Sequence, residues 1–302
     1  MRQPWAGVPV SHGSYESSDT LFGHWCRTLG SRAMTEPSSK NDTGRFVWYE
    51  LLSTDPQGAL AFYVEVMGWK TQPFEVGGDG DYRMWVGGQG PLGGVTALPE
   101  PAKKLGASSY WQANVQVANV DETVAEVKRL GGQVYVKEDV PSVGRIAVIA
   151  DPQGAVIAVF SPAADMQSHD VARQGEFSWH ELYTTDHEAA FTFYERIVGW
   201  ERLGEFDMGA MGKYLLWGRN GKQLGGMLTL PKGMKTPDGR DVPPSWMYYV
   251  TVEDLDAALA RATAKGARVL NGPMQVPGGQ RIVQLMDPQG AAFALTTPPT
   301  PR

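Results

Sequence analysis

The sequence predicts an α+β fold built from four βαβββ units, which are arranged as two tandem modules. Two observations lead to this prediction. The second half of the chain repeats the motifs of the first half in the same order, which indicates a duplicated architecture. Within each half, two helical segments that end at glycine are flanked by short segments with the composition of strands.

Three motifs define the repeat. They are FVWYEL at 46–51 and FSWHEL at 177–182, FYVEVMGW at 62–69 and FYERIVGW at 193–200, and DPQG at 151–154 and 287–290. The first two pairs are separated by the same number of residues, so the repeat runs in register. We expect the modules to occupy 44–162 and 177–298, with a polar linker at 163–176 and a disordered extension at 1–43.

The first unit begins with an alternating, aromatic segment at 46–52, which predicts a strand. Asp55 is typical of a helix N-cap, and Pro56 suits the first helical position. The apolar face of this helix continues to Met67, and Gly68 predicts its end. Short strands are predicted at 82–86 and 94–98.

The second unit follows the same plan. A strand is predicted at 111–117, then a helix that begins at Asp121 and ends before Gly131-Gly132. Strands follow at 133–137, 145–150 and 155–160, and the DPQG motif makes a tight turn between the last two, with glycine at the position that needs a positive φ. The other glycine pairs, Gly93-Gly94 and Gly225-Gly226, indicate strand bulges, because no phosphate-loop lysine follows them.

The composition of the 302 residues is that of a globular protein, with 42% hydrophobic and 20% charged residues and a net charge of −6. No cluster of Lys and Arg is present, so we expect no nucleic-acid partner. The apolar runs have the length of strands, so we expect no membrane partner. Cys26 is the single cysteine, which suits the cytoplasm. Met34 begins a polar stretch typical of a bacterial N-terminus, so we expect 1–33 to precede the natural start.

The FY pair near the helix end, the GW after it and the DPQG turn, all repeated in register, resemble the vicinal oxygen chelate superfamily. This superfamily contains glyoxalase I, extradiol dioxygenases and bleomycin-resistance proteins, and the closest resemblance is to two-module, glyoxalase-like "hydroxylase" proteins of actinobacteria. It implies that two βαβββ units pair to curl a sheet around a cup that holds the site. Because all four units lie in one chain, the resemblance also implies a monomer or a homodimer.

The metal-dependent members carry ligands at fixed places on the first and last strands. By resemblance, these places correspond to Trp48, Gln112 and Ala158 in the first module and to Trp179, Met247 and Ala294 in the second. None of these residues is a histidine or a glutamate, so we expect no metal and no cofactor. His180 and His187 are expected to be surface or helix-packing residues, since alternation turns His180 away from Trp179.

Strand alternation predicts which side chains face each cup. They are Trp48, Glu50, Gln112, Asn114 and Gln116 in the first module, and Trp179, Glu181, Tyr183, Met247, Tyr249 and Thr251 in the second. Glu50 and Glu181 are candidates for a catalytic acid or base, because burial among aromatic rings raises the pKa of a carboxyl. The alternative is that both glutamates only accept hydrogen bonds and stabilise the fold. The extra hydroxyls of the second cup favour Glu181 over Glu50.

Eight of the ten tryptophans form four repeat pairs, and two of these pairs have different predicted roles. Trp48 and Trp179 can line a ligand pocket or pack in the core, while Trp69 and Trp200 are expected to pack in the core. Arg145 and Arg281 also correspond, and they can pair with an anionic ligand or with the two glutamates.

Two functions remain open on this basis. The first is the binding of a small planar or carbonyl-containing molecule in a metal-free aromatic cup. The second is a metal-independent lyase, isomerase or hydroxylase that uses Glu50 or Glu181 as acid or base. Fold alone does not choose between them, because one scaffold supports unrelated chemistries.

Overall fold

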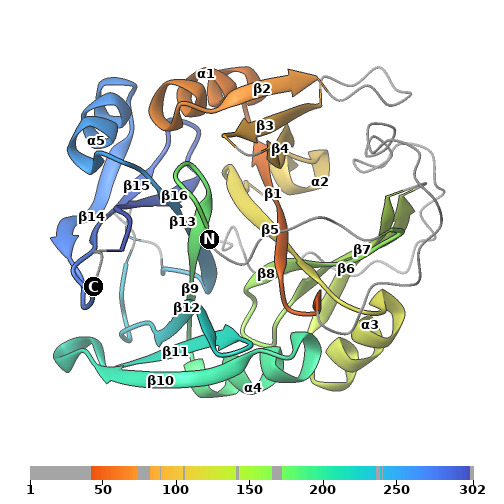
Figure 1. The fold of residues 1–302 in the computed structure, drawn as a ribbon. Helices are drawn as coiled ribbons and strands as arrows, with labels where there is room; N and C mark the ends of the chain where they lie inside the picture. The colour runs from red at the N-terminus through yellow and green to blue at the C-terminus, as the bar shows by residue number, and fades with distance from the viewer. Residues whose placement is uncertain are drawn as a thin grey trace.

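The computed structural model describes residues 42–73, 82–88, 90–104, 106–140, 143–164, 172–235, 239 and 241–299. These residues form two eight-stranded mixed sheets, one from each half of the chain, with helices packed against them (Figure 1). The α+β class and the two-module plan are therefore confirmed. Most of the expected extension at 1–43 lies outside the described residues.

The first half contains these elements: β1 (Phe46–Ser53), α1 (Pro56–Met67), β2 (Lys70–Pro73), β3 (Arg83–Gly87), β4 (Gly90–Ala97), α2 (Glu100–Lys104), β5 (Tyr110–Gln116), α3 (Val120–Arg129), β6 (Gln133–Val140), β7 (Gly144–Ala150) and β8 (Val156–Pro162). The second half contains β9 (Phe177–Thr184), α4 (His187–Val198), β10 (Glu201–Asp207), a 3-10 turn η2 (Gly209–Met211), β11 (Lys213–Arg219), β12 (Lys222–Thr229), β13 (Ser245–Thr251), α5 (Leu255–Ala264), β14 (Arg268–Gln275), β15 (Arg281–Met286) and β16 (Ala292–Thr296).

Both sheets have the same strand order. The first sheet runs β2-β3-β4-β1-β5-β8-β7-β6, and the second runs β10-β11-β12-β9-β13-β16-β15-β14. Each βαβββ unit supplies four neighbouring strands, and the two units of a module join where their first strands pair antiparallel, β1 with β5 and β9 with β13. The sequence did not predict β2 or α2. The four residues of β2 are largely exposed at the sheet edge and lack the apolar alternation on which that prediction depends.

The helix ends follow the predicted caps. The Asp55 side chain accepts a hydrogen bond from the Gly58 N–H at 3.0 Å, and Gly68 takes the left-handed conformation at φ 70°. The helix α3 begins at Val120, one residue earlier than predicted, because Asn119 rather than a later residue caps it. The DPQG turn is also confirmed, with Gly154 at φ +104°.

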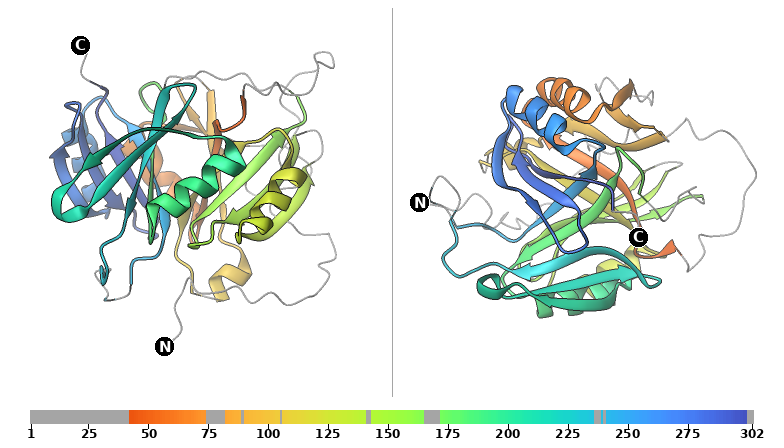
Figure 2. Two further views of the ribbon diagram at one scale, coloured as in Figure 1. Left: turned by 90° about the horizontal axis from the view of Figure 1, so that it is seen from below. Right: turned by 60° about the vertical axis from the view of Figure 1, so that its left-hand side comes forward.

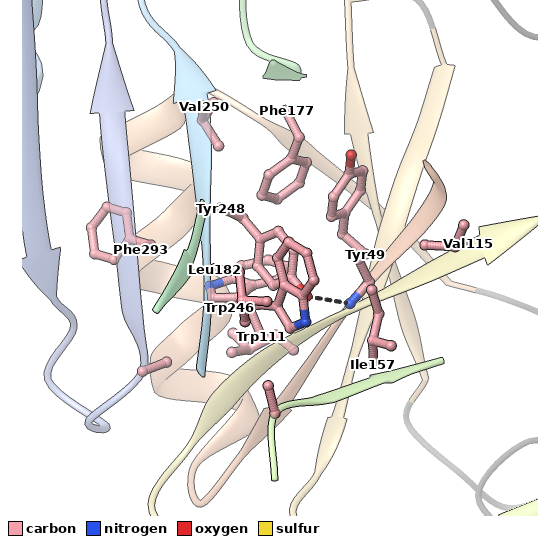
Figure 3. Packing of buried hydrophobic residues seen from close by; sticks show 14 of the residues in the cluster. Tyr49, Trp111, Val115, Ile157, Phe177, Leu182, Trp246, Tyr248, Val250 and Phe293 are labelled. Carbon is pink, nitrogen blue, oxygen red and sulfur yellow. Dashed lines mark hydrogen bonds between the residues drawn. The ribbon is translucent and has the colours of Figure 1, made fainter. Parts of the chain in front are cut away.

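One face of each sheet, together with the helices, builds a single core shared by the two modules (Figure 3). The helices α1 and α5 pack together although they belong to different modules, and so do α3 and α4 (Figures 1 and 2). The rings of Tyr49 and Phe177 stack with their centroids 3.8 Å apart, which joins the first strands of the two modules. The other face of each sheet, which carries the predicted cup residues, points away from this core.

The repeated motifs contact each other across the module boundary. The hydroxyl of Tyr63, in the first FY motif, donates to Asp287 of the second DPQG turn at 3.0 Å. The symmetric pair, Tyr194 and Asp151, lies at 3.2 Å. The predicted core role of the GW tryptophans is confirmed, because both are buried and each indole N–H donates to a backbone carbonyl of the other module, Trp69 to Gly175 at 2.6 Å and Trp200 to Gly44 at 2.8 Å.

His180 corrects one expectation, because it is neither a surface residue nor a helix-packing residue. It is buried between the modules, where its ring stacks on Phe46 at 3.6 Å and bonds the Tyr49 hydroxyl at 2.6 Å. Burial lowers the pKa of His180 from 6.5 to about 4, so the ring is neutral near pH 7. Within the described ranges, no helix is both long and apolar enough to cross a membrane.

Candidate functional site

The predicted cup residues lie together on the outer face of each sheet. In the first sheet, Trp48 pairs with Asn114 across β1 and β5, and Asn114 pairs with Ala158 of β8, so these three residues form one level of the face. Glu50 pairs with Gln112 at the next level. In the second sheet, the corresponding levels are Trp179, Tyr249 and Ala294, then Glu181 and Met247. The register thus places Asn114, rather than Gln112, level with Trp48.

Glu50 is buried, with 1% of its surface exposed, and is held from one side only. Its Oε2 accepts from the Tyr82 hydroxyl at 2.8 Å and from the Trp48 indole N–H at 3.1 Å. Its Oε1 has no hydrogen-bond partner among the residues that the structure describes. Burial raises the pKa of this carboxyl from 4.5 to about 7, against the opposing effect of the two hydrogen bonds. Glu50 therefore sits near the midpoint of its titration at neutral pH.

The glycine pairs explain how Tyr82 reaches Glu50. A Cβ on Gly94 would lie 1.9 Å from the Tyr82 hydroxyl, so only glycine leaves space for this ring. A Cβ on its neighbour Gly93 would lie 1.8 Å from the backbone carbonyl oxygen of Tyr49 on β1. The predicted bulge is present as a register shift between Trp85 and Val86 in the pairing of β3 with β4. The pair Gly225-Gly226 plays the same part beneath Tyr214 in the second module.

Glu181 occupies the equivalent place but is held from both sides. The Tyr214 hydroxyl donates to its Oε1 at 2.7 Å. Its Oε2 accepts from the hydroxyls of Tyr183 at 2.5 Å and Tyr249 at 2.7 Å, and from the Gln284 amide at 3.1 Å. Gln284 also donates to both tyrosine oxygens, which closes the network.

The two sites therefore differ in what they can offer a ligand. Burial and the neighbouring carboxylate raise the pKa of Tyr183, Tyr214 and Tyr249, so their hydroxyls stay protonated and donate to Glu181. Both carboxylate oxygens of Glu181 accept at least one hydrogen bond from within the chain. In the first site, by contrast, Glu50 Oε1 and Asn114 Oδ1 are buried acceptors without a partner.

Sequence reasoning identified Glu50 and Glu181 but missed three residues that hold them. Tyr82 and Tyr214 form a repeat pair, each three residues before a repeated tryptophan, and this spacing was the available signal. Gln284 has no polar counterpart at Val148, the equivalent place on β7 of the first module, so the repeat gave no signal for it.

The alternative in which Arg145 and Arg281 pair with the two glutamates is wrong, and the alternative of an anionic ligand stays a prediction. Arg145 pairs with Asp139 and Asp121, and Arg281 pairs with Asp256, all on the exposed surface. Neither arginine contacts a cup glutamate. Exposed pairs of this kind contribute little to stability.

The positions where this fold holds a metal do not suit one in this chain. An indole and a methyl group, from Trp48 and Ala158, occupy the ends of the first level, and Trp179 and Ala294 do so in the second. Neither group supplies a lone pair for Zn²⁺, Fe²⁺ or Mn²⁺. These four residues therefore do not fit a metal ion.

One group of potential metal ligands occurs among the described residues, away from both cups. The side chains of His187, Glu188 and Glu205 offer atoms within 4.8 Å of one another on α4 and β10. Arg202 already pairs with Glu188 at 2.8 Å and with Glu205 at 2.6 Å. Lys213 also contacts Glu205, at 2.7 Å, so the two carboxylates are neutralised by cations of the chain.

Comparison with known proteins agrees with this geometry. The family described as the glyoxalase/bleomycin resistance protein/dioxygenase superfamily matches residues 176–295, and a glyoxalase-like domain family matches residues 48–160. Among solved structures, the Mn(II)-bound glyoxalase of Novosphingobium aromaticivorans is 17% identical with a TM-score of 0.57, covering 86% of this chain and 83% of that one. The 2,2',3-trihydroxybiphenyl 1,2-dioxygenase of Sphingomonas wittichii is 11% identical with a TM-score of 0.60, covering 85% and 91%.

Two relatives match over most of their length. A Mycobacterium tuberculosis protein named as a glyoxylase, CFP32, is 30% identical over 253 residues, which cover 83% of this chain and 94% of the relative. The anthracycline biosynthesis protein DnrV of Streptomyces peucetius is 29% identical over 265 residues, covering 83% and 92%. The resemblance drawn from the motifs is confirmed, and the chain belongs to the glyoxalase/bleomycin resistance protein/dioxygenase superfamily.

Proposed function

We propose that this chain binds a small aromatic molecule, without a metal, on the outer face of the first sheet around Glu50. The observation that carries the proposal is the unpartnered Oε1 of a carboxyl that is 1% exposed. A buried acceptor left unpaired costs about 1–3 kcal/mol, and a ligand that donates to it recovers this energy on binding. We favour Glu50 over Glu181, because both oxygens of Glu181 already accept hydrogen bonds within the chain, whereas Glu50 Oε1 accepts none from the described residues.

The neighbours of Glu50 support an aromatic ligand. Trp48, Tyr82 and Met84 form one buried cluster beside it, and rings of this kind offer flat surfaces for stacking. The relative named for anthracycline biosynthesis supports the same class of ligand, since anthracyclines contain aromatic rings. Ligand sites commonly combine apolar walls with a few polar groups that fix orientation.

Two measurements test this proposal. Elemental analysis of dialysed protein is expected to find far less than one transition metal per chain. Crystals soaked with a mixture of aromatic compounds are expected to show density beside Glu50 and none beside Glu181. Stoichiometric metal bound in the first module, or density confined to the second module, would contradict it.

A second function is supported by the titration of Glu50. A pKa of about 7 suits a general base or acid at neutral pH, so a metal-independent lyase, isomerase or hydroxylase is the alternative. In that case Glu50→Gln removes turnover while the ligand still binds, whereas a pure binding protein shows only a change in affinity.

A further inference from the structure

The charge around Glu50 is unbalanced. No Lys, Arg or His of the described residues forms an ion pair or hydrogen bond with it, and its hydrogen-bond donors are the Trp48 indole and the Tyr82 phenol. On the opposite strand it faces the neutral amide of Gln112. The ionised form of Glu50 therefore has no cation of the chain to compensate it.

Two buried acceptors on this face have no partner among the described residues. The unpartnered buried atoms are Glu50 Oε1 and Asn114 Oδ1, which lie on adjacent strands one level apart on the same face. Residues related diagonally in this way lie within reach of one planar group. A ligand that complements these two acceptors presents donors to them.

We propose that the ligand of the first module is an organic cation whose N–H groups donate to Glu50 and Asn114, with its aromatic part against Trp48. This inference rests on the proposed function and names the chemical class of its ligand. A cation supplies the missing charge, and its N–H groups fill the two acceptors. The indole face of Trp48 adds a cation–π attraction that neutral molecules do not obtain.

An anionic ligand does not fit this face. A carboxylate or phosphate would meet the Glu50 carboxyl without any arginine or lysine of the described cup to offset the repulsion. A neutral aromatic molecule would stack on Trp48 but would leave the charge of Glu50 unbalanced. The second module serves as an internal comparison, because Glu181 has the same strand position and four donors from the chain.

Calorimetric titration of the full chain with benzamidine and with benzamide tests the inference. The two probes have nearly the same shape, but only benzamidine is cationic and presents N–H donors on both nitrogens. At pH 8 benzamidine is expected to bind at least tenfold more tightly than benzamide. The variant Glu50→Gln is expected to abolish this difference, and Glu181→Gln, checked to be folded by its unfolding temperature, is expected to keep it.

The pH dependence provides a second readout. Benzamidine stays protonated between pH 6 and pH 8, so its affinity follows the ionisation of Glu50, whose pKa is about 7. Tyr82 is the other titratable group that contacts Glu50. Affinity is expected to fall about tenfold from pH 8 to pH 6 in the original chain, but not in Glu50→Gln.

The outcomes separate the two proposals. If benzamidine and benzamide bind with equal affinity, or if Glu50→Gln does not change the difference in their affinities, the proposal of a cationic ligand is overturned. The proposal of an aromatic ligand is not affected by that result. If the difference in affinity between the two probes is lost in Glu181→Gln but kept in Glu50→Gln, the cation binds in the second module and the proposal is overturned. Binding of neither probe overturns the cationic ligand, and binding of no compound from the aromatic mixture contradicts the proposed function itself.

Discussion

Replacing Glu50 with glutamine is expected to make the folded chain more stable at alkaline pH. Burial raises the pKa of Glu50 from 4.5 to about 7, so the folded chain holds this proton more tightly than the unfolded chain does. The stabilising effect of the protonated carboxyl is fully present below about pH 4.5 and is lost as the pH rises through about 7. Glutamine keeps the acceptor for Tyr82 and Trp48 but does not ionise.

The size of the effect follows from the difference in pKa. One pKa unit corresponds to about 1.4 kcal/mol, so the interval from 4.5 to about 7 gives about 3 kcal/mol at pH 8. At pH 5 most of this difference has disappeared. The stability difference is the free energy of unfolding of Glu50→Gln minus that of the original chain. This difference should therefore be about 2–3 kcal/mol larger at pH 8 than at pH 5.

Urea denaturation of both proteins at pH 5, 6, 7 and 8, without ligand, measures this difference. The comparison at pH 5 controls for any effect of glutamine that does not depend on ionisation. A stability difference between the two proteins that stays constant with pH, or that moves in favour of the original chain as the pH rises, would refute the reasoning that Glu50 is an uncompensated buried carboxyl.

Three further predictions concern the contacts around the sites and between the modules. Glu181→Gln should lower stability by about 1–3 kcal/mol, because an amide cannot accept all four donors, and thermal unfolding would reveal an unchanged midpoint if the network were unimportant. Tyr63→Phe should cost a similar amount, since it removes the hydrogen bond to the other module, and an unaffected urea midpoint would contradict this. Gly94→Ala should displace Tyr82 and weaken aromatic-ligand binding, whereas Gly88→Ala, which meets no atom within 4 Å, should not; equal binding by both variants would exclude the steric explanation.

The repeat made most of the fold predictable, because duplicated motifs marked equivalent elements in both halves. Caps and turns such as Asp55 and Gly154 were identified because their residue types have specific backbone roles. The short edge strand β2 was missed, since its exposed residues carry no periodic signal. Contacts between modules were not predictable, because the FY and DPQG motifs reveal nothing about which copy each one meets.

The candidate site was predictable in part. Alternation on β1 and β9 placed Glu50 and Glu181 on the correct faces, because strand geometry fixes this from sequence. The donors that distinguish the two glutamates come from other strands, so their arrangement depends on tertiary packing. Gln284 in particular reaches Glu181 from β15, a distant segment of the chain, and nothing in its local sequence indicates this.

The shared core has a consequence for how such a protein can change over time. The stability of each module depends on the other, because they share a packed aromatic core. Hydrogen bonds also cross between the modules, from Tyr63 to Asp287 and from Tyr194 to Asp151. The two outer faces lie beyond that layer, so a substitution on one face leaves the opposite face and the common interior undisturbed. Duplication has thus given this chain one shared core and two outer sheet faces that can vary independently. For this reason Glu181 can accept hydrogen bonds at both carboxylate oxygens, while the equivalent Glu50 keeps one oxygen without a partner among the described residues.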